Sequence, residues 1–178
     1  MAPSLDFLKS LKKESFKSKS FRMAMNWYPM FFATGAKVLF WSGDWSEVQL
    51  RLTLNIWTRN YVKTIFGGSM FSATDPFYVI MFMHMLGKDF VVWDKSASIK
   101  FKRPGKDPLY ALFKITPEIL DKVIAEVKDD NETTFIAHIQ WIDKKQNVYA
   151  ELERTIYIAD KKFYKEKLEK RKLAKEGS

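Results

Sequence analysis

The feature that most constrains the fold is the segment Phe77–Leu86, which is apolar at nearly every position. A helix with no polar face cannot lie on a surface and has to be surrounded by other elements. A glycine pair precedes the segment, and Gly87 is suited to end it as a C′ residue. We therefore predict one central helix over residues 68–86. We expect it to kink just after Asp75, because Pro76 removes a backbone donor.

Length and composition exclude several classes of protein. The 178 residues suffice for one domain with a substantial core. No apolar run approaches the roughly 18 residues of a membrane span, and residues 1–20 lack the apolar stretch of a secretion signal. The absence of cysteine excludes disulfides and thiolate chemistry. With only His84 and His138 available, we expect no metal. We predict a cytoplasmic protein without stable membrane insertion.

The net charge of +9 is concentrated at the two ends of the chain. Residues 1–20 carry +3, residues 161–178 carry +5 and the intervening body carries only +1. Charged ends of this kind are typical of solvated helices, and no recognisable nucleic-acid module is present. We therefore expect no nucleic-acid partner. The open alternative is an interaction protein that uses its basic terminal helices on RNA or an anionic membrane.

The first half of the chain predicts two helices and a hairpin. Apolar spacing indicates an amphipathic helix over residues 4–17, with Ser4 as its N-cap. A short helix over 29–35 would begin with a proline at an early position. Residues 37–42 and 48–54 are separated by a Gly-Asp turn and predict a hairpin. The strict alternation over 48–54 is typical of a half-buried strand.

The second half predicts strands on both sides of one short helix. The segments that read as strands are 90–101, 109–115, 133–142 and 148–158, with a helix over 117–127 between them. The fold class is therefore α+β, with a curved antiparallel sheet of five or six strands wrapped around the long central helix. We predict a single domain over 1–178, comprising N-terminal helices (1–35), a core (36–160) and a basic C-terminal helix (161–178).

This arrangement resembles the hotdog fold of acyl-CoA thioesterases and dehydratases, through small motifs spread across residues 45–160. Phenylacetate-type thioesterases open the central helix with His-Gly-Gly, and an acidic residue follows. Gly67, Gly68 and Asp75 stand at matching positions, while Phe66 replaces the histidine. Phe-Gly-Gly followed by Thr-Asp-Pro resembles the thioesterase-like DUF4442 branch in particular.

The resemblance implies a cofactor-independent acyl-CoA or acyl-carrier-protein thioesterase whose site forms between subunits of a homodimer or dimer of dimers. The Gly68 amide at the helix N-terminus would polarise the thioester carbonyl. Asp75, expected on a buried helix face where its pKa would rise, would act as base or nucleophile. Asn60 would orient water or the carbonyl. Further substrate-binding candidates are Phe66, Gly67, Ser72, Lys102 and Arg103.

Each of these residues also has a purely structural interpretation. The glycine pair can be only a tight turn, and Asn60 a loop cap. Asp75 can cap the break made by Pro76 or pair with a lysine or arginine, and both histidines can be packed in the core. At the level of function, the main alternative is a non-catalytic hotdog module that binds an acyl chain or acyl-CoA.

Overall fold

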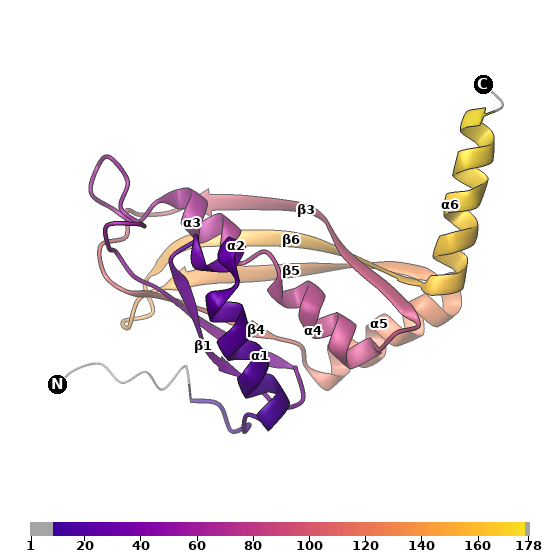
Figure 1. The fold of residues 1–178 in the computed structure, drawn as a ribbon, viewed down its shortest axis with the longest axis horizontal. Helices are drawn as coiled ribbons and strands as arrows, with labels where there is room; N and C mark the ends of the chain where they lie inside the picture. Colours follow the sequence, from indigo (N-terminus) through magenta and orange to yellow (C-terminus); the bar gives the residue numbers. More distant parts are fainter. Residues whose placement is uncertain (1–8, 177–178) are drawn as a thin grey trace.

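Six antiparallel strands form one curved sheet in the computed structural model, which describes residues 9–176 (Figure 1). The strand order is β1-β2-β4-β5-β6-β3. The strands are β1 (Ala36–Trp41), β2 (Glu47–Leu52), β3 (Phe90–Phe101), β4 (Leu109–Lys114), β5 (Glu132–Ile142) and β6 (Val148–Asp160). The predicted strands and the α+β class are confirmed.

The helices pack around this sheet, and one of them lies in its curve. They are α1 (Phe16–Trp27), α2 (Pro29–Phe32), α3 (Gly67–Ser72), α4 (Phe77–Leu86), α5 (Pro117–Asp130) and α6 (Lys161–Glu176). α4 buries Tyr78 and Phe82 against the rings of Phe113 and Phe135 on the sheet. A curved antiparallel sheet around an apolar helix is the hotdog arrangement expected from the sequence.

The predicted continuous helix over residues 68–86 is wrong, because residues 73–76 form a turn between α3 and α4. Pro76 has no N–H to continue the helical ladder. The Thr74 hydroxyl and backbone N–H both donate to the Phe71 carbonyl, at 2.8 and 3.2 Å. The helix therefore ends in a local turn that presents Asp75, instead of kinking around it.

The N-terminal helix also begins later than predicted. Residues 1–8, including the proposed cap Ser4, lie outside the described residues, and residues 9–15 are not helical. The N-cap is Ser15, which forms a reciprocal capping box with Ser18. The short second helix is confirmed at its proline start, although it ends at Phe32.

Burial differs from expectation at three places. The hairpin of β1 and β2 is confirmed, but Glu47 and Gln49 are buried alongside the apolar positions, so β2 is covered on both faces. His84 and His138 are exposed, so their prediction as core histidines is wrong. His84 stacks on Trp45 with 3.6 Å between ring centroids.

The two edges of the sheet differ in whether side chains bond to their outer backbone groups. The Asn26 amide donates to the Val38 carbonyl (3.1 Å) and accepts from its N–H (2.8 Å), and Glu14 accepts from the Trp41 N–H (3.1 Å). Asn26 on α1 and Glu14 just before it therefore form hydrogen bonds with the backbone at the β1 edge, which another strand would otherwise be able to use. At the other edge, no described strand pairs with the outer side of β3.

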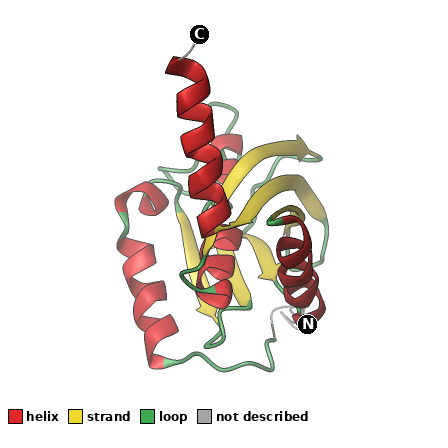
Figure 2. Cartoon of the chain, turned by 90° about the vertical axis from the view of Figure 1, so that its right-hand side faces the viewer, coloured by secondary structure: helices red, strands yellow, loops and turns green. Residues whose placement is uncertain are grey.

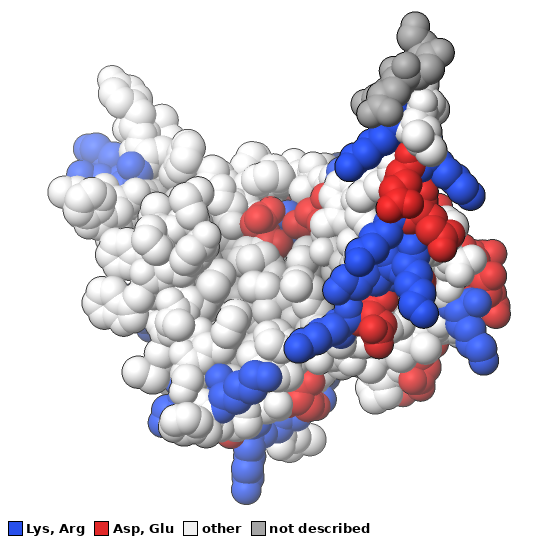
Figure 3. All heavy atoms as spheres, turned by 45° about the vertical axis from the view of Figure 1, so that its right-hand side comes forward, with Lys and Arg blue, Asp and Glu red and all other residues white. Residues whose placement is uncertain are grey.

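The charged C-terminal helix is confirmed, and it projects beyond the sheet (Figure 2). Its first turns contact the body through Tyr164 against Tyr157 and through an ion pair of Lys167 with Glu132. Basic side chains gather along it, whereas the left half of the view in Figure 3 carries few charges.

Candidate functional site

The turn between α3 and α4 holds Asp75 at the surface. The Asp75 side chain is 65% exposed, so the expectation of a buried aspartate is wrong. One carboxylate oxygen accepts a 2.8 Å hydrogen bond from Nη1 of Arg154. Of the roles left open for Asp75, the structure therefore shows an ion pair with an arginine.

Arg154 lies in the middle of β6 and is 1% exposed. Its Nη1 also donates to Asp94 Oδ2 at 2.9 Å. Its Nε donates to the Thr74 hydroxyl (3.2 Å) and its Nη2 to the Phe71 carbonyl (3.1 Å). Buried cations persist when they are paired and hydrogen-bonded, and Arg154 satisfies both conditions.

Asp94 lies on β3 beside a β-bulge and completes this cluster. Its Oδ1 atom is buried without a hydrogen-bond partner among the described residues. Burial raises the pKa of Asp94 to about 6; Arg154 opposes the rise, and the charge and hydrogen bond of Asp75 add to it. We call Asp75, Arg154 and Asp94 the carboxylate–arginine cluster.

Arg154 and Asp94 were missed by sequence reasoning, although one signal was present. Ala150, Leu152, Ile156 and Ile158 alternate along β6 and are all buried, so Arg154 occupies an inward position of the same series. A cation on the buried face of a strand needs a carboxylate partner. Its partners stand 79 and 60 residues away in the sequence.

Asp75 borders a largely apolar pocket of about 450 Å³. Its walls come from α1, α2, α3 and the residues that follow them, namely Met25, Tyr28, Met30, Phe31, Phe71, Ser72 and Pro76. Ser72 therefore lies with Asp75, as the sequence suggested. An apolar pocket with one carboxylate at its border has the composition of a small-molecule site.

Asn60 lies in a different pocket of about 420 Å³, together with Gly67, Lys102 and Arg103. Its amide oxygen accepts from the Thr64 N–H (3.0 Å) and its amide nitrogen donates to the Thr64 hydroxyl (2.9 Å), which closes a loop. Asn60 thus caps a loop, and within one chain the structure does not bring it to the pocket of Asp75.

Aromatic rings cover the two glycines that begin α3. A Cβ on Gly67 would lie 2.6 Å from the Phe101 ring, and one on Gly68 would lie 2.2 Å from the Phe66 ring. A larger residue at either position would push the ring aside, so glycine lets both rings lie directly on the start of α3. Both rings are more than half exposed, so they are free to move when a ligand approaches the first N–H groups of α3.

The basic candidates beside Gly67 are partly engaged. Lys102 pairs with Glu151 at 2.8 Å, and the Arg103 guanidinium lies 5.7 Å from the centroid of the Tyr149 ring. Within residues 9–176, no group of three His, Cys, Asp or Glu side chains is placed to hold a metal ion. No described helix is long and apolar enough to cross a membrane.

The chain is similar to one protein family in sequence and to several solved structures in fold. Residues 17–158 match the model of a family described as a domain of unknown function, DUF4442. No curated protein matches the chain. A probable thioesterase from Pseudomonas aeruginosa is structurally similar, with a TM-score of 0.70 and 15% identity over 83% of this chain and 98% of the other.

Two further solved structures share the fold. A thioesterase from Haemophilus influenzae has a TM-score of 0.59 at 9% identity, covering 85% of this chain and 96% of its own. The PaaI protein of the phenylacetic acid degradation operon of E. coli has a TM-score of 0.54 at 16% identity, covering 81% and 94%. At these identities the likeness shows the hotdog fold alone.

Proposed function

The chain belongs to the DUF4442 family, and from this premise we propose that it hydrolyses the thioester of an acyl-CoA or acyl-carrier protein without a cofactor. Two structurally similar proteins are described as a thioesterase and a probable thioesterase, which supports this reaction class. The proposed compartment is the cytoplasm, in keeping with a chain without cysteine.

The observation that carries the proposal is the position of Asp75. Its carboxylate is exposed to water, is held by Arg154, and borders an apolar pocket large enough for an acyl chain. A fixed carboxylate beside an apolar pocket is suited to deliver water to a thioester whose acyl group lies in that pocket.

In the proposed reaction, Asp75 acts as a general base. It takes a proton from water while the water oxygen attacks the thioester carbonyl carbon. The Gly68 N–H at the start of α3, contributed by a second copy of the chain, would stabilise the resulting oxyanion once the Phe66 ring has moved aside. The C–S bond then breaks, and the proton passes to the departing thiolate, giving a carboxylic acid and a thiol.

Arg154 and Asp94 would act through Asp75. Arg154 holds the carboxylate in place from β6. Ionisation of Asp94 adds a second negative charge to the cluster, and this charge would attract the proton that leaves the attacking water. Activity should therefore rise as Asp94 loses its proton near pH 6.

We further propose that the site is completed by a second copy of the chain. The unpaired edge of β3 is available for antiparallel pairing. Since Asn60, Gly67, Lys102 and Arg103 line one pocket and Asp75 another, a dimer would allow the basic pocket of one subunit to serve the carboxylate of its partner. Lys102 and Arg103 would meet the phosphates of the carrier.

A binding module without turnover is the second candidate, and the Phe66 ring over Gly68 favours it. The two functions differ in one experiment. Purified protein is incubated with a panel of acyl-CoAs, and release of free thiol is followed. Turnover of at least one substrate supports hydrolysis, whereas tight binding to all without thiol release would support the binding module.

A further inference from the structure

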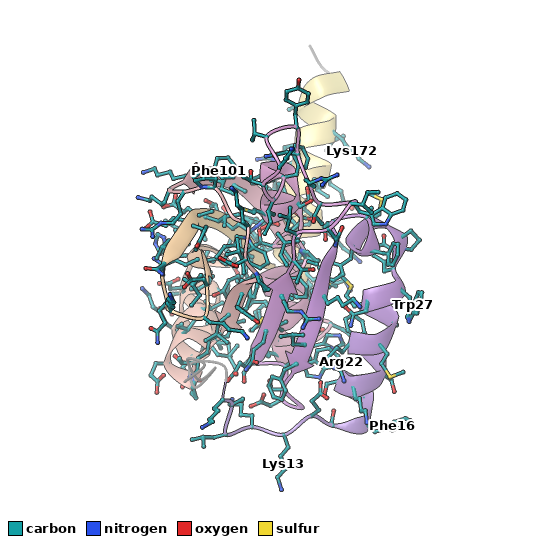
Figure 4. All side chains as sticks on the ribbon, turned by 90° about the vertical axis from the view of Figure 1, so that its left-hand side faces the viewer. Lys13, Phe16, Arg22, Trp27, Phe101 and Lys172 are labelled. Atoms are coloured by element: carbon teal, nitrogen blue, oxygen red, sulfur yellow. The ribbon has the colours of Figure 1, made fainter. Side chains whose placement is uncertain are left out.

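The outer surface of the N-terminal helices carries an apolar face that nothing in the described chain covers. Its six large side chains are each 55–89% exposed. We define this α1–α2 face as Phe16, Met23, Trp27, Met30, Phe32 and Trp57. Figure 4 shows Phe16 and Trp27 pointing away from the body of the protein. Exposed apolar patches of this kind mark interaction sites.

The face is built into the sequence of α1. Phe16, Met23 and Trp27 follow the spacing i, i+7, i+11 and therefore form one stripe along the helix. The opposite side of the helix already buries Ser18 and Met25 against the protein. A helix that only covered the sheet would carry polar residues on its outer side, so this second apolar stripe has another use.

Two aromatic side chains of the face stack on each other. Trp27 and Phe32 stack with their ring planes 6° apart and their centroids 6.2 Å apart. Together with Trp57 and Lys37 they surround a shallow hollow of about 350 Å³. The rings of Trp27 and Phe32 are therefore presented to solvent side by side.

The chain segment that forms most of the face carries positive charge, while the carboxylate of Asp75 stands in the pocket that Met30 also lines. No aspartate or glutamate occurs between Glu14 and Asp44, and Glu14 is paired with Arg22 at 2.7 Å. Lys19 and Lys37 are exposed in this region. Exposed Trp and Phe side chains beside lysines are suited to the interface of an anionic lipid layer.

The location of the face argues against a second copy as its occupant. α1 lies along β1, whose backbone edge is occupied by Asn26. β1 and the unpaired strand β3 are at opposite edges of the sheet. A subunit paired along β3 would leave the α1–α2 face uncovered.

We propose that the α1–α2 face docks the protein onto an anionic phospholipid surface, with α1 lying in the plane of the interface. Trp27, Phe32 and Trp57 enter the headgroup region, and Lys19 and Lys37 meet the lipid phosphates. Met30 also lines the pocket of Asp75, so an acyl chain can pass from the lipid layer along this wall. Docking itself does not require Asp75 to be catalytic.

The test is co-sedimentation of the full-length protein with vesicles of phosphatidylcholine containing phosphatidylglycerol, compared with phosphatidylcholine alone. We expect binding to the anionic vesicles, and a loss of about tenfold or more in the combined variant Trp27→Ser, Phe32→Ser, Trp57→Ser. The matched control is Ile136→Ser, which removes an exposed apolar side chain from β5 and should bind as the wild type does.

Two further variants distinguish binding through the α1–α2 face from binding through the basic helix α6. Lys19→Glu with Lys37→Glu keeps the aromatic side chains and should also weaken binding to anionic vesicles, even if the serine variant folds poorly. The combined variant Lys170→Glu, Arg171→Glu, Lys172→Glu reverses the charge of α6 and should leave most of the binding to anionic vesicles intact. The inference is overturned if the α6 variant alone abolishes binding, or if both variants of the face bind as the wild type does. A fall from dimer to monomer in the serine variant with unchanged vesicle binding would also overturn it.

Discussion

Arg154 is buried and pairs with two carboxylates, the exposed one of Asp75 and the largely buried one of Asp94, and its removal leaves both without their cation. We predict that Arg154→Met lowers the free energy of unfolding by about 3–5 kcal/mol, measured by urea denaturation. Lys102→Met removes a half-exposed ion pair with Glu151 and should cost no more than about 1 kcal/mol. Equal losses of unfolding free energy in the two variants would show that the pairing of Arg154 with the two carboxylates does not stabilise the protein more than a surface ion pair does.

Asp94 gives the stability of the protein a pH dependence whose sign is fixed by its pKa. The folded-state pKa of about 6 lies above the ordinary value of 3.8. Between these values the folded state binds more protons than the unfolded state, so stability falls as pH rises from about 4 to 6. The full effect is at most about 3 kcal/mol.

We therefore predict that Asp94→Asn removes the loss of stability between pH 4 and 6. The unfolding midpoints of the wild type and the variant are measured at pH 4.5 and at pH 7. The advantage of the wild type over the variant should be larger at pH 4.5. The proposed link to activity adds that an inflection near pH 6 in kcat/KM is lost in Asp94→Asn. A variant that keeps both the stability slope and the inflection would exclude Asp94 as their source.

Sequence patterns identified Asp75, the glycine pair and the pocket residue Ser72, because these lie within one short segment. The ion pairs of Asp75 and Asp94 with Arg154 depend on how β6 is positioned beside β3 and the turn after α3. That positioning arises from tertiary packing, so the local sequence carried no direct sign of it. The Phe101 ring over Gly67 was not predicted, because it comes from β3 and is brought there by tertiary packing.

At the scale of elements, the start of α1 depends on a capping box. Ser15→Ala removes the acceptor of the Ser18 N–H and should cost about 1 kcal/mol of stability. Ser20→Ala lies on the exposed side of the same helix and should change stability by no more than a few tenths of a kcal/mol. Thermal unfolding of both variants distinguishes the cap from general effects of losing a serine.

Strong local signals explain which elements were predictable. The apolar run of α4, the hairpin around Gly43 and the helix that begins at Pro117 each carry a clear local signal, and each was found. The start of α1 was not found, because the apolar spacing that predicted a helix over residues 4–17 does not reveal the capping box of Ser15 with Ser18. Pro76 predicted only a kink after α3, because the Thr74–Phe71 hydrogen bonds that complete the break leave no mark on the periodicity.

At the scale of the whole molecule, the unpaired β3 strand predicts a dimer. Light scattering of the purified protein should give twice the mass of one chain, and dilution to the monomer should reduce hydrolysis if the site is shared. Full activity in a monomer would contradict the proposed completion of the site by a partner subunit.

The central claim is that Asp75 carries out hydrolysis of an acyl thioester, and the acyl-CoA panel tests it most directly. We predict that Asp75→Asn lowers kcat by about 10²- to 10⁴-fold on every substrate that the wild type cleaves, with unfolding and oligomeric mass unchanged. Asp121→Asn, at an exposed position of α5, should retain wild-type rates. Undiminished hydrolysis by a folded Asp75→Asn protein would contradict the assignment.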